Sequence, residues 1–147
     1  MAAPSRTGAP ASMSHALKIL PVLLILAGCG TLGMPEDATS LNGFRASHGR
    51  APLSSDAALT AMAQTHAGDM ARRDVLDHAG FKEQRGPMGA RAENVAYGCA
   101  DSPCVIKQWV NSSGHRANML LPSVTKYGLA SAVSKSGKRY WALELGE

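Results

Sequence analysis

The feature that most constrains this chain is a short apolar run near the N-terminus. Residues 19–27 are apolar, follow Lys18 and contain Pro21. As a helix they would span about 14 Å, less than half of a hydrocarbon core of about 30 Å. A basic residue, a short apolar run and small residues after it are typical of a secretory signal. The signal is not part of the folded domain, so we expect one domain in the rest of the 147 residues.

The run ends in Leu26, Ala27, Gly28 and Cys29. These residues resemble the lipobox of bacterial lipoproteins, in which the cysteine thiol is acylated and becomes the new N-terminus. The resemblance implies a signal peptide at 1–28, with residue 13 as an alternative start, and a lipidated Cys29 that begins a tether at 29–38. The acyl chains would make the membrane a partner of the protein. An uncleaved signal-anchor and ordinary secretion are the alternatives.

The predicted location is the extracytoplasmic side of the cell envelope. Gly30, and not an acidic residue, follows the cysteine, which slightly favours the outer membrane. In such an oxidising compartment Cys99 and Cys104 are predicted to form a disulfide across a short loop. Two free thiols are the alternative. A tetrahedral metal site would need a second cysteine pair, which the sequence lacks.

The charge of the chain argues against nucleic acid as a partner. Arg6 and Lys18 precede Cys29, which leaves 13 basic against 11 acidic side chains after it. Charges of both signs are interspersed and aromatic residues are few, so no basic stripe with aromatic residues forms.

Periodicity predicts helices first and a hairpin last, which is an α+β arrangement with helices covering the sheet faces. Asp37 or Thr39 is expected to cap the first helix, and Pro103 suits the first turn of the third. The predicted helices are 39–48, 57–73 and 104–112 with a helical turn at 114–121, and the predicted strands are 93–97, 127–133 and 139–145. Residues 77–91 are expected to be irregular.

Three polar side chains form a candidate metal site: His78, Glu93 and His115. Neutral imidazoles suit zinc-like ions, and a carboxylate can bind the metal or orient a ligand. From spacing alone, satisfied buried polar residues explain the same pattern. His66 on an apolar helix stripe is predicted to be a core histidine, and Arg45 to pair with a carboxylate that fixes the first helix.

A longer set of motifs occurs in one order along residues 39–147. It resembles the small bacterial SCP-like form of the CAP superfamily (cysteine-rich secretory proteins, antigen 5 and pathogenesis-related proteins). The motifs are Leu41-Asn42 to Gly49, Pro52-Leu53, Ala63 to Ala71, His78, Glu93-Asn94, Trp109 to Leu120, Tyr127-Gly128 and Tyr140-Trp141.

The resemblance implies a three-layer α-β-α sandwich with a small antiparallel sheet and a central cavity. In the family, two histidines and two acidic residues in this cavity can hold a divalent cation such as zinc. His78, Glu93 and His115 match three of these positions. Ser112 stands at the fourth, so the set is incomplete, and Asn94 is expected beside the cavity.

The family implies a binding or interaction module at the envelope, with a lipid, a glycan or a protein as ligand. A metal-dependent hydrolase (a peptidase or a wall hydrolase) is the alternative, with the metal lowering the pKa of a bound water and Glu93 as general base. A structural surface lipoprotein with an unused cavity is the third hypothesis. The sequence shows neither a nucleophile elbow nor an oxyanion hole, so we do not predict an enzyme.

Overall fold

The computed structural model describes residues 1–2 and 40–147. The predictions for Cys29 and for the tether at 29–38 lie outside the described residues, as does the signal segment apart from its first two residues. The helices are α1 (Leu41–Ala46), α2 (Ala57–Arg73), the π-helix η1 (Phe81–Arg85), α3 (Ser102–Val110) and α4 (Ser113–Met119). The strands are β1 (Ser54–Ser55), β2 (Ala90–Tyr97), β3 (Lys126–Val133) and β4 (Arg139–Gly146).

The strands form one sheet in the order β1-β3-β4-β2. Strand β4 pairs antiparallel with β3, as the final hairpin predicts, and it also pairs antiparallel with β2. The two-residue strand β1 adds a short parallel pairing to β3, so the sheet is mixed and not purely antiparallel as expected. Strand β2 lies at the other edge and leaves one side of its backbone free of strand partners.

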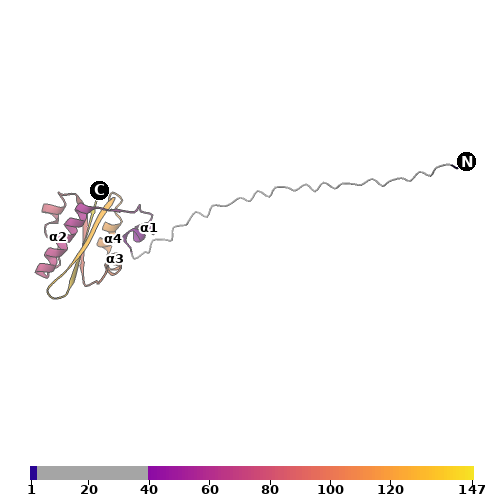
Figure 1. The fold of residues 1–147 in the computed structure, drawn as a ribbon. Coiled ribbons are helices and arrows are strands. Elements are labelled where there is room, and N and C mark those ends of the chain that lie inside the picture. Colours follow the sequence, from indigo (N-terminus) through magenta and orange to yellow (C-terminus); the bar gives the residue numbers. More distant parts are fainter. Residues whose placement is uncertain (3–39) are drawn as a thin grey trace. The chain divides into compact units, whose positions relative to one another are not determined.

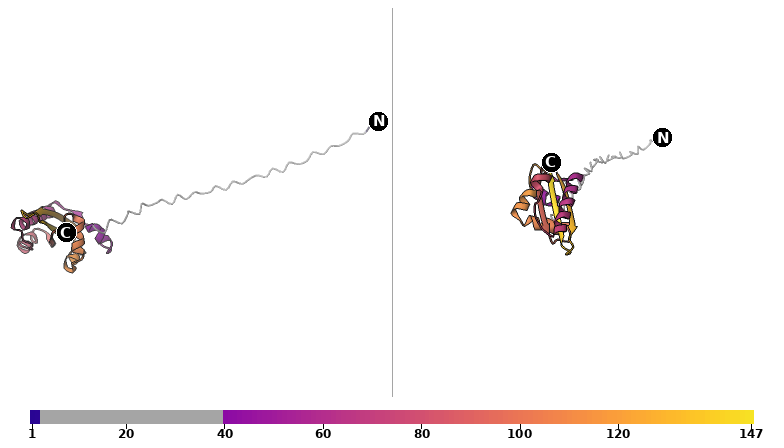
Figure 2. Two further views of the ribbon diagram at one scale, coloured as in Figure 1. Left: turned by 90° about the horizontal axis from the view of Figure 1, so that it is seen from below. Right: turned by 90° about the vertical axis from the view of Figure 1, so that its left-hand side faces the viewer.

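Helices cover both faces of this sheet (Figures 1 and 2). Val95, Ala130, Tyr140 and Ala142 face α2 and pack in one core cluster with its small apolar residues. Their neighbours in sequence point the other way and form the larger cluster with α1, α3 and α4, whose centre is the fully buried Trp109. The period of two along each strand produces this division. The α+β class and the α-β-α layering are therefore confirmed.

Helix α2 has the bounds that its periodicity predicts. Asp56 caps its start by accepting from the backbone N–H of Leu59, and the left-handed Asp74 ends it. The helix lies close to β3 at Gly128, where a Cβ would overlap the backbone of Leu59 and Thr60. Only glycine permits this approach.

Two details of the N-terminal part differ from expectation. Ser40, and not Asp37 or Thr39, caps α1, and the helix ends at Ala46. Arg45 is buried and donates to the backbone carbonyls of Ala51, Met119 and Leu121, and within residues 40–147 no carboxylate pairs with it. The carbonyls at the end of α4 have no partners within their helix, and the guanidinium satisfies them.

The segment predicted to be irregular contains an ordered turn. Gly80, with a φ of 76° that glycine adopts readily, precedes the π-helix η1. Strand β2 begins three residues earlier than predicted. A π-turn has no periodicity that a sequence pattern could reveal.

Cys99 and Cys104 form the predicted disulfide. Asp101 inside the loop caps α3 by accepting from the N–H of Cys104, and the indole of Trp141 donates to the carbonyl of Cys99. The disulfide thus ties the start of α3 to the end of β2. Across residues 1–2 and 40–147, no helix has the length and hydropathy needed to span a bilayer.

Candidate functional site

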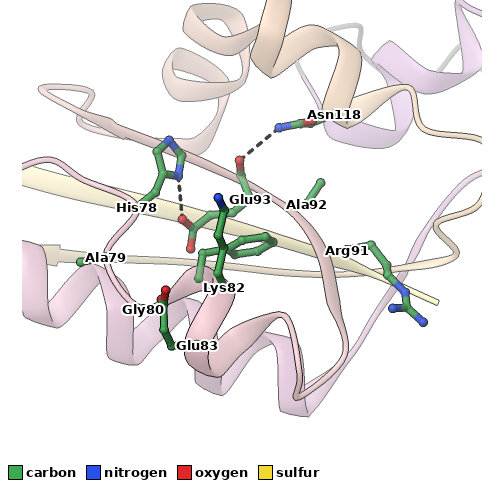
Figure 3. Close-up of a pocket in the computed structure, with 10 residues that line it drawn as sticks. His78, Ala79, Gly80, Lys82, Glu83, Arg91, Ala92, Glu93 and Asn118 are labelled. Carbon is green, nitrogen blue, oxygen red and sulfur yellow. Dashed lines mark hydrogen bonds and ion pairs between the residues drawn. The ribbon is translucent and has the colours of Figure 1, made fainter.

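A pocket of about 490 Å³ opens at the edge of the sheet, beside β2. The segment after α2, the start of β2 and one residue of α4 surround it (Figure 3). Its lining residues are His78, Ala79, Gly80, Phe81, Lys82, Glu83, Arg91, Ala92, Glu93 and Asn118. Two of the predicted site residues, His78 and Glu93, therefore share one pocket.

His78 and Glu93 are in direct contact. The Nδ1 atom of His78 lies 2.7 Å from Oε1 of Glu93 (Figure 3). The side chain of His78 is 55% exposed, whereas that of Glu93 is 1% exposed. An ionised carboxylate only accepts hydrogen bonds, so Nδ1 donates and Nε2 is left as an acceptor on the open side of the pocket.

Asp77 holds the loop that carries His78. Its carboxylate accepts from Arg73 at 2.7 Å and from the backbone N–H of Ala79 at 3.1 Å. The hydrogen bond from Arg73 is the main reason that the pKa of Asp77 falls to about 2. The carbonyl of Asp77 lies 2.9 Å from Nε2 of the buried His66.

Below the pocket, Arg85 lies between two buried carboxyls. Its Nε lies 2.7 Å from Oε2 of Glu93 and 2.9 Å from Oε1 of Glu144, and its Nη2 lies 2.6 Å from Oε2 of Glu93. Burial, together with the hydrogen bond and charge of Glu93, raises the pKa of Glu144 to about 9, although Arg85 opposes the shift. Glu144 therefore stays protonated at neutral pH and the Glu93–Arg85 pair carries no net charge.

His66 completes this buried cluster. It is 2% exposed, and its Nε2 lies 3.7 Å from Oε1 of Glu93. Burial lowers the pKa of His66 and outweighs the opposing effect of the Glu93 charge. His66 is thus a neutral core histidine that supports the loop, as predicted.

Helix α4 closes the pocket from the other side of β2. The amide of Asn118 donates to the carbonyl of Glu93 at 3.1 Å (Figure 3). It also donates to Oδ1 of Asn94 at 2.9 Å. Asn94 is fully buried and donates to the carbonyl of His115 at 3.0 Å. These two asparagines bind the free edge of β2 to α4.

His115 and Ser112, like Asn94, lie outside the pocket lining. The ring of His115 is half-buried and lies 6.5 Å from that of Trp109. Burial, and to a lesser degree His78, lowers the pKa of His115, so its ring is neutral. Ser112 occupies the N-cap position of α4 and makes no side-chain cap hydrogen bond.

In this structure His78, Glu93 and His115 are not gathered as a three-ligand metal site. Both oxygens of Glu93 are engaged, one by His78 and the other by Arg85. Within the described part of the chain, no three His, Cys, Asp or Glu side chains are gathered so that they could hold a metal ion. Glu93 orients His78 here.

Sequence reasoning did not find Arg85 or Glu144 as parts of the site. Glu144 did carry a signal, because it is a charged residue between Leu143 and Leu145 in an apolar strand. A buried carboxyl in that position needs a partner. Arg85 had no such signal, since it lies in the segment that showed no periodicity.

A second pocket of about 550 Å³ lies between α2 and η1. Met62 and Met88 line one end, and His66 and Arg85 also contribute to its wall. Although it is larger, its exposed charged side chains Asp69 and Arg73 are paired with Arg72 and Asp77, whereas His78 presents a half-exposed imidazole to the first pocket. We therefore place the candidate site in the pocket at the edge of the sheet.

Comparison with known proteins agrees with this architecture. The model of the cysteine-rich secretory protein (CAP) family matches residues 39–145. Two similar proteins of Bacillus subtilis are the uncharacterized membrane protein YlbC, 30% identical over 97 residues, and the uncharacterized protein YkwD, 31% identical over 104 residues. The matches cover 60% and 65% of this chain but only 28% and 40% of these relatives.

Among solved structures, an extracellular protein containing an SCP domain from Bacillus anthracis is similar in fold. It superimposes with a TM-score of 0.58 and 28% sequence identity, over 73% of this chain and 38% of the other. This chain therefore spans less than half of the length of each of these three relatives.

Proposed function

Because the chain belongs to the cysteine-rich secretory protein (CAP) family, we propose that it is a binding module of the cell envelope that recognises a glycan in the His78 pocket. The observation that carries the proposal is the pocket of about 490 Å³ with an exposed imidazole held by a buried carboxylate. A volume of this size suits a small ligand, and fixed polar groups give such a pocket its specificity.

The charges of the pocket favour a polar ligand without net charge. Lys82 and Glu83, which both line the pocket, carry opposite charges. Arg85 balances the charge of Glu93 below the pocket. Arg91 is paired with Glu147 at 3.1 Å. The acceptor Nε2 of His78 and the ring of Phe81 would then suit the hydroxyl groups and the apolar face of a sugar.

The export of the domain rests on the apolar run and the lipobox-like residues before Cys29. Similar proteins support an envelope location, since YlbC is described as a membrane protein and the Bacillus anthracis protein as extracellular. We propose that acyl chains on Cys29 hold the domain at the extracytoplasmic side, with the outer membrane favoured by Gly30.

The glycan proposal is tested by NMR on the ¹⁵N-labelled full chain in detergent micelles. A β-1,4-linked disaccharide of N-acetylglucosamine should cause saturable shifts at residues around the pocket. His78→Ala should abolish them, and His48→Ala should not, because His48 is exposed at the end of α1. Shifts that are absent from the wild type, or equal in the wild type and His78→Ala, would contradict the proposal. Shifts with phospholipid vesicles instead would favour a lipid ligand.

A divalent cation at His78, His115 and Glu93 remains a prediction from the sequence. Zinc titration by calorimetry tests it on the wild type and on the His78→Ala/His115→Ala double variant. Heat that the double variant loses would support a site on the two imidazoles. Equal heats of zinc binding in the wild type and the double variant would contradict a cation site in the pocket.

The contact between His78 and Glu93 also favours a second candidate, a hydrolase. A carboxylate-bound imidazole can act as a general base through Nε2. Glu93 itself is covered by Arg85, so the base role predicted for Glu93 would pass to His78. Incubation of the wild type and His78→Gln with cell-wall fragments tests this candidate, and no turnover by the wild type would exclude it for those substrates.

A further inference from the structure

The two buried carboxyls of the site lie opposite each other on neighbouring strands. Glu93 of β2 and Glu144 of β4 are partners in the antiparallel register, and their side chains are 1% and 0% exposed. Like charges in directly opposed positions destabilise a sheet, and burial increases this cost. Because Glu144 is held in its protonated form, one cation beside Glu93 is enough for the pair.

Arg85 supplies this cation from outside the sheet. Its Nε contacts both carboxyls, at 2.7 Å for Glu93 and 2.9 Å for Glu144. Its Nη1 donates to the carbonyl of Ala79 at 2.9 Å, directly after His78. The guanidinium thus connects the His78 loop to the carboxylate that His78 contacts.

The contacts of Glu93 divide between its two oxygens. Oε2 faces Arg85, and Oε1 is left for His78 at 2.7 Å. A carboxylate held by a guanidinium on one oxygen cannot rotate freely about its side chain. Its other oxygen therefore keeps one direction, toward Nδ1 of His78.

We propose that Arg85 is the positioning residue of the pocket: it holds Glu93 so that Nδ1 of His78 carries the proton and Nε2 faces the pocket as an acceptor. Arg85 does not touch a ligand in this role and acts only through Glu93. The inference deepens the proposed function and rests on it, since it states how the binding residue His78 is oriented. A merely structural arginine would stabilise the fold without deciding which nitrogen of His78 is protonated.

The tautomer of His78 is the decisive readout. Long-range ¹H–¹⁵N spectra of the full chain in micelles, recorded where the imidazole is neutral, report which nitrogen is protonated. In the wild type we expect the Nδ1–H tautomer in roughly tenfold excess, because a hydrogen bond to a charged group favours it. Arg85→Met should give a mixture of tautomers. Arg85→Gln, which keeps a polar side chain but removes the charge, should do the same if the methionine variant does not fold.

Arg91→Met is the matched control. Arg91 also lines the pocket, but its side chain points away from His78 (Figure 3). It pairs with Glu147. Its loss should leave the tautomer unchanged. A wild type with Nε2 protonated, or a folded Arg85 variant that keeps the Nδ1–H tautomer, would overturn the proposal. If the tautomer of His78 depends on Arg85 but the wild type binds no disaccharide, the glycan function is contradicted and the positioning role of Arg85 is still supported.

Discussion

At the scale of single residues, Glu144 is a carboxyl whose surroundings strongly disfavour its charged form. It is fully buried, it faces Glu93, and it shares one guanidinium with it. Its pKa of about 9 means that the folded protein retains a proton that the unfolded chain has lost. The stability from this proton is complete below the unfolded pKa of 4.5 and is lost as the pH rises toward 9.

This gives a pH-dependence that one substitution should remove. Between pH 7 and 8.5, the free energy of unfolding of the wild type should fall by up to about 1.4 kcal/mol per pH unit. Glu144→Gln, which is neutral at every pH, should lose this slope. Urea unfolding followed by circular dichroism at several pH values measures it. Glu83→Gln, at an exposed position on the pocket rim, should keep the wild-type slope. Parallel slopes in the wild type and Glu144→Gln would show that Glu144 is ionised in the folded state.

At the scale of the elements, the contact between α2 and β3 decides how the layers pack. The helix backbone at Leu59 and Thr60 lies where a side chain at position 128 would be. Only a glycine fits here, because the atoms that a Cβ would meet belong to the backbone of Leu59 and Thr60 and cannot move away as a side chain could. The sheet and α2 are therefore closest at Gly128.

Gly128→Ala should destabilise the domain by about 3 kcal/mol or more, because the helix must move away from the sheet. Gly68→Ala is the control, since a Cβ there meets nothing within 4 Å and the residue lies inside α2. It should stabilise the domain by about 0.5–1 kcal/mol through the lower entropy of the unfolded chain. Denaturant midpoints of the two variants measure both effects. A Gly128→Ala variant as stable as the wild type would mean that the layers are not packed at this distance.

At the scale of the whole molecule, the predicted lipid anchor and the described domain rest on different residues. The described domain contains the pocket, the disulfide and both cores, and none of these depends on how the chain is anchored. The anchor rests on Cys29 and the residues before it. Lipidation would keep the pocket at the membrane surface, where envelope glycans are within reach.

Cys29→Ser tests the anchor directly. In a bacterial host the wild type should incorporate labelled fatty acid and partition into the detergent phase, since several acyl chains hold a protein to a bilayer. The serine variant should lose the label and leave the membrane fraction. Cys99→Ser/Cys104→Ser should keep the label, because these two cysteines are joined to each other. An unlabelled wild type would exclude lipidation in that host.

The sequence by itself determined the elements whose signals are local. Helix α2 follows from its apolar stripe and the cap at Asp56, and β3 and β4 follow from their apolar runs and the turn between them. The disulfide follows from two close cysteines in a chain that is predicted to be exported. These features depend on residues a few positions apart, so a linear pattern contains the needed information.

Only the tertiary structure decided how the site is built. Arg85, Glu93 and Glu144 are brought together by the register of β4 against β2 and by the π-turn that starts at Gly80. Glu144 lies 51 positions after Glu93, and no local pattern predicts which residues will face each other across a sheet. Glu93, predicted as a metal ligand, is thereby enclosed by a guanidinium and becomes the group that orients His78. The energy of a buried charge depends on its neighbours in space, and these exist only once the chain has folded.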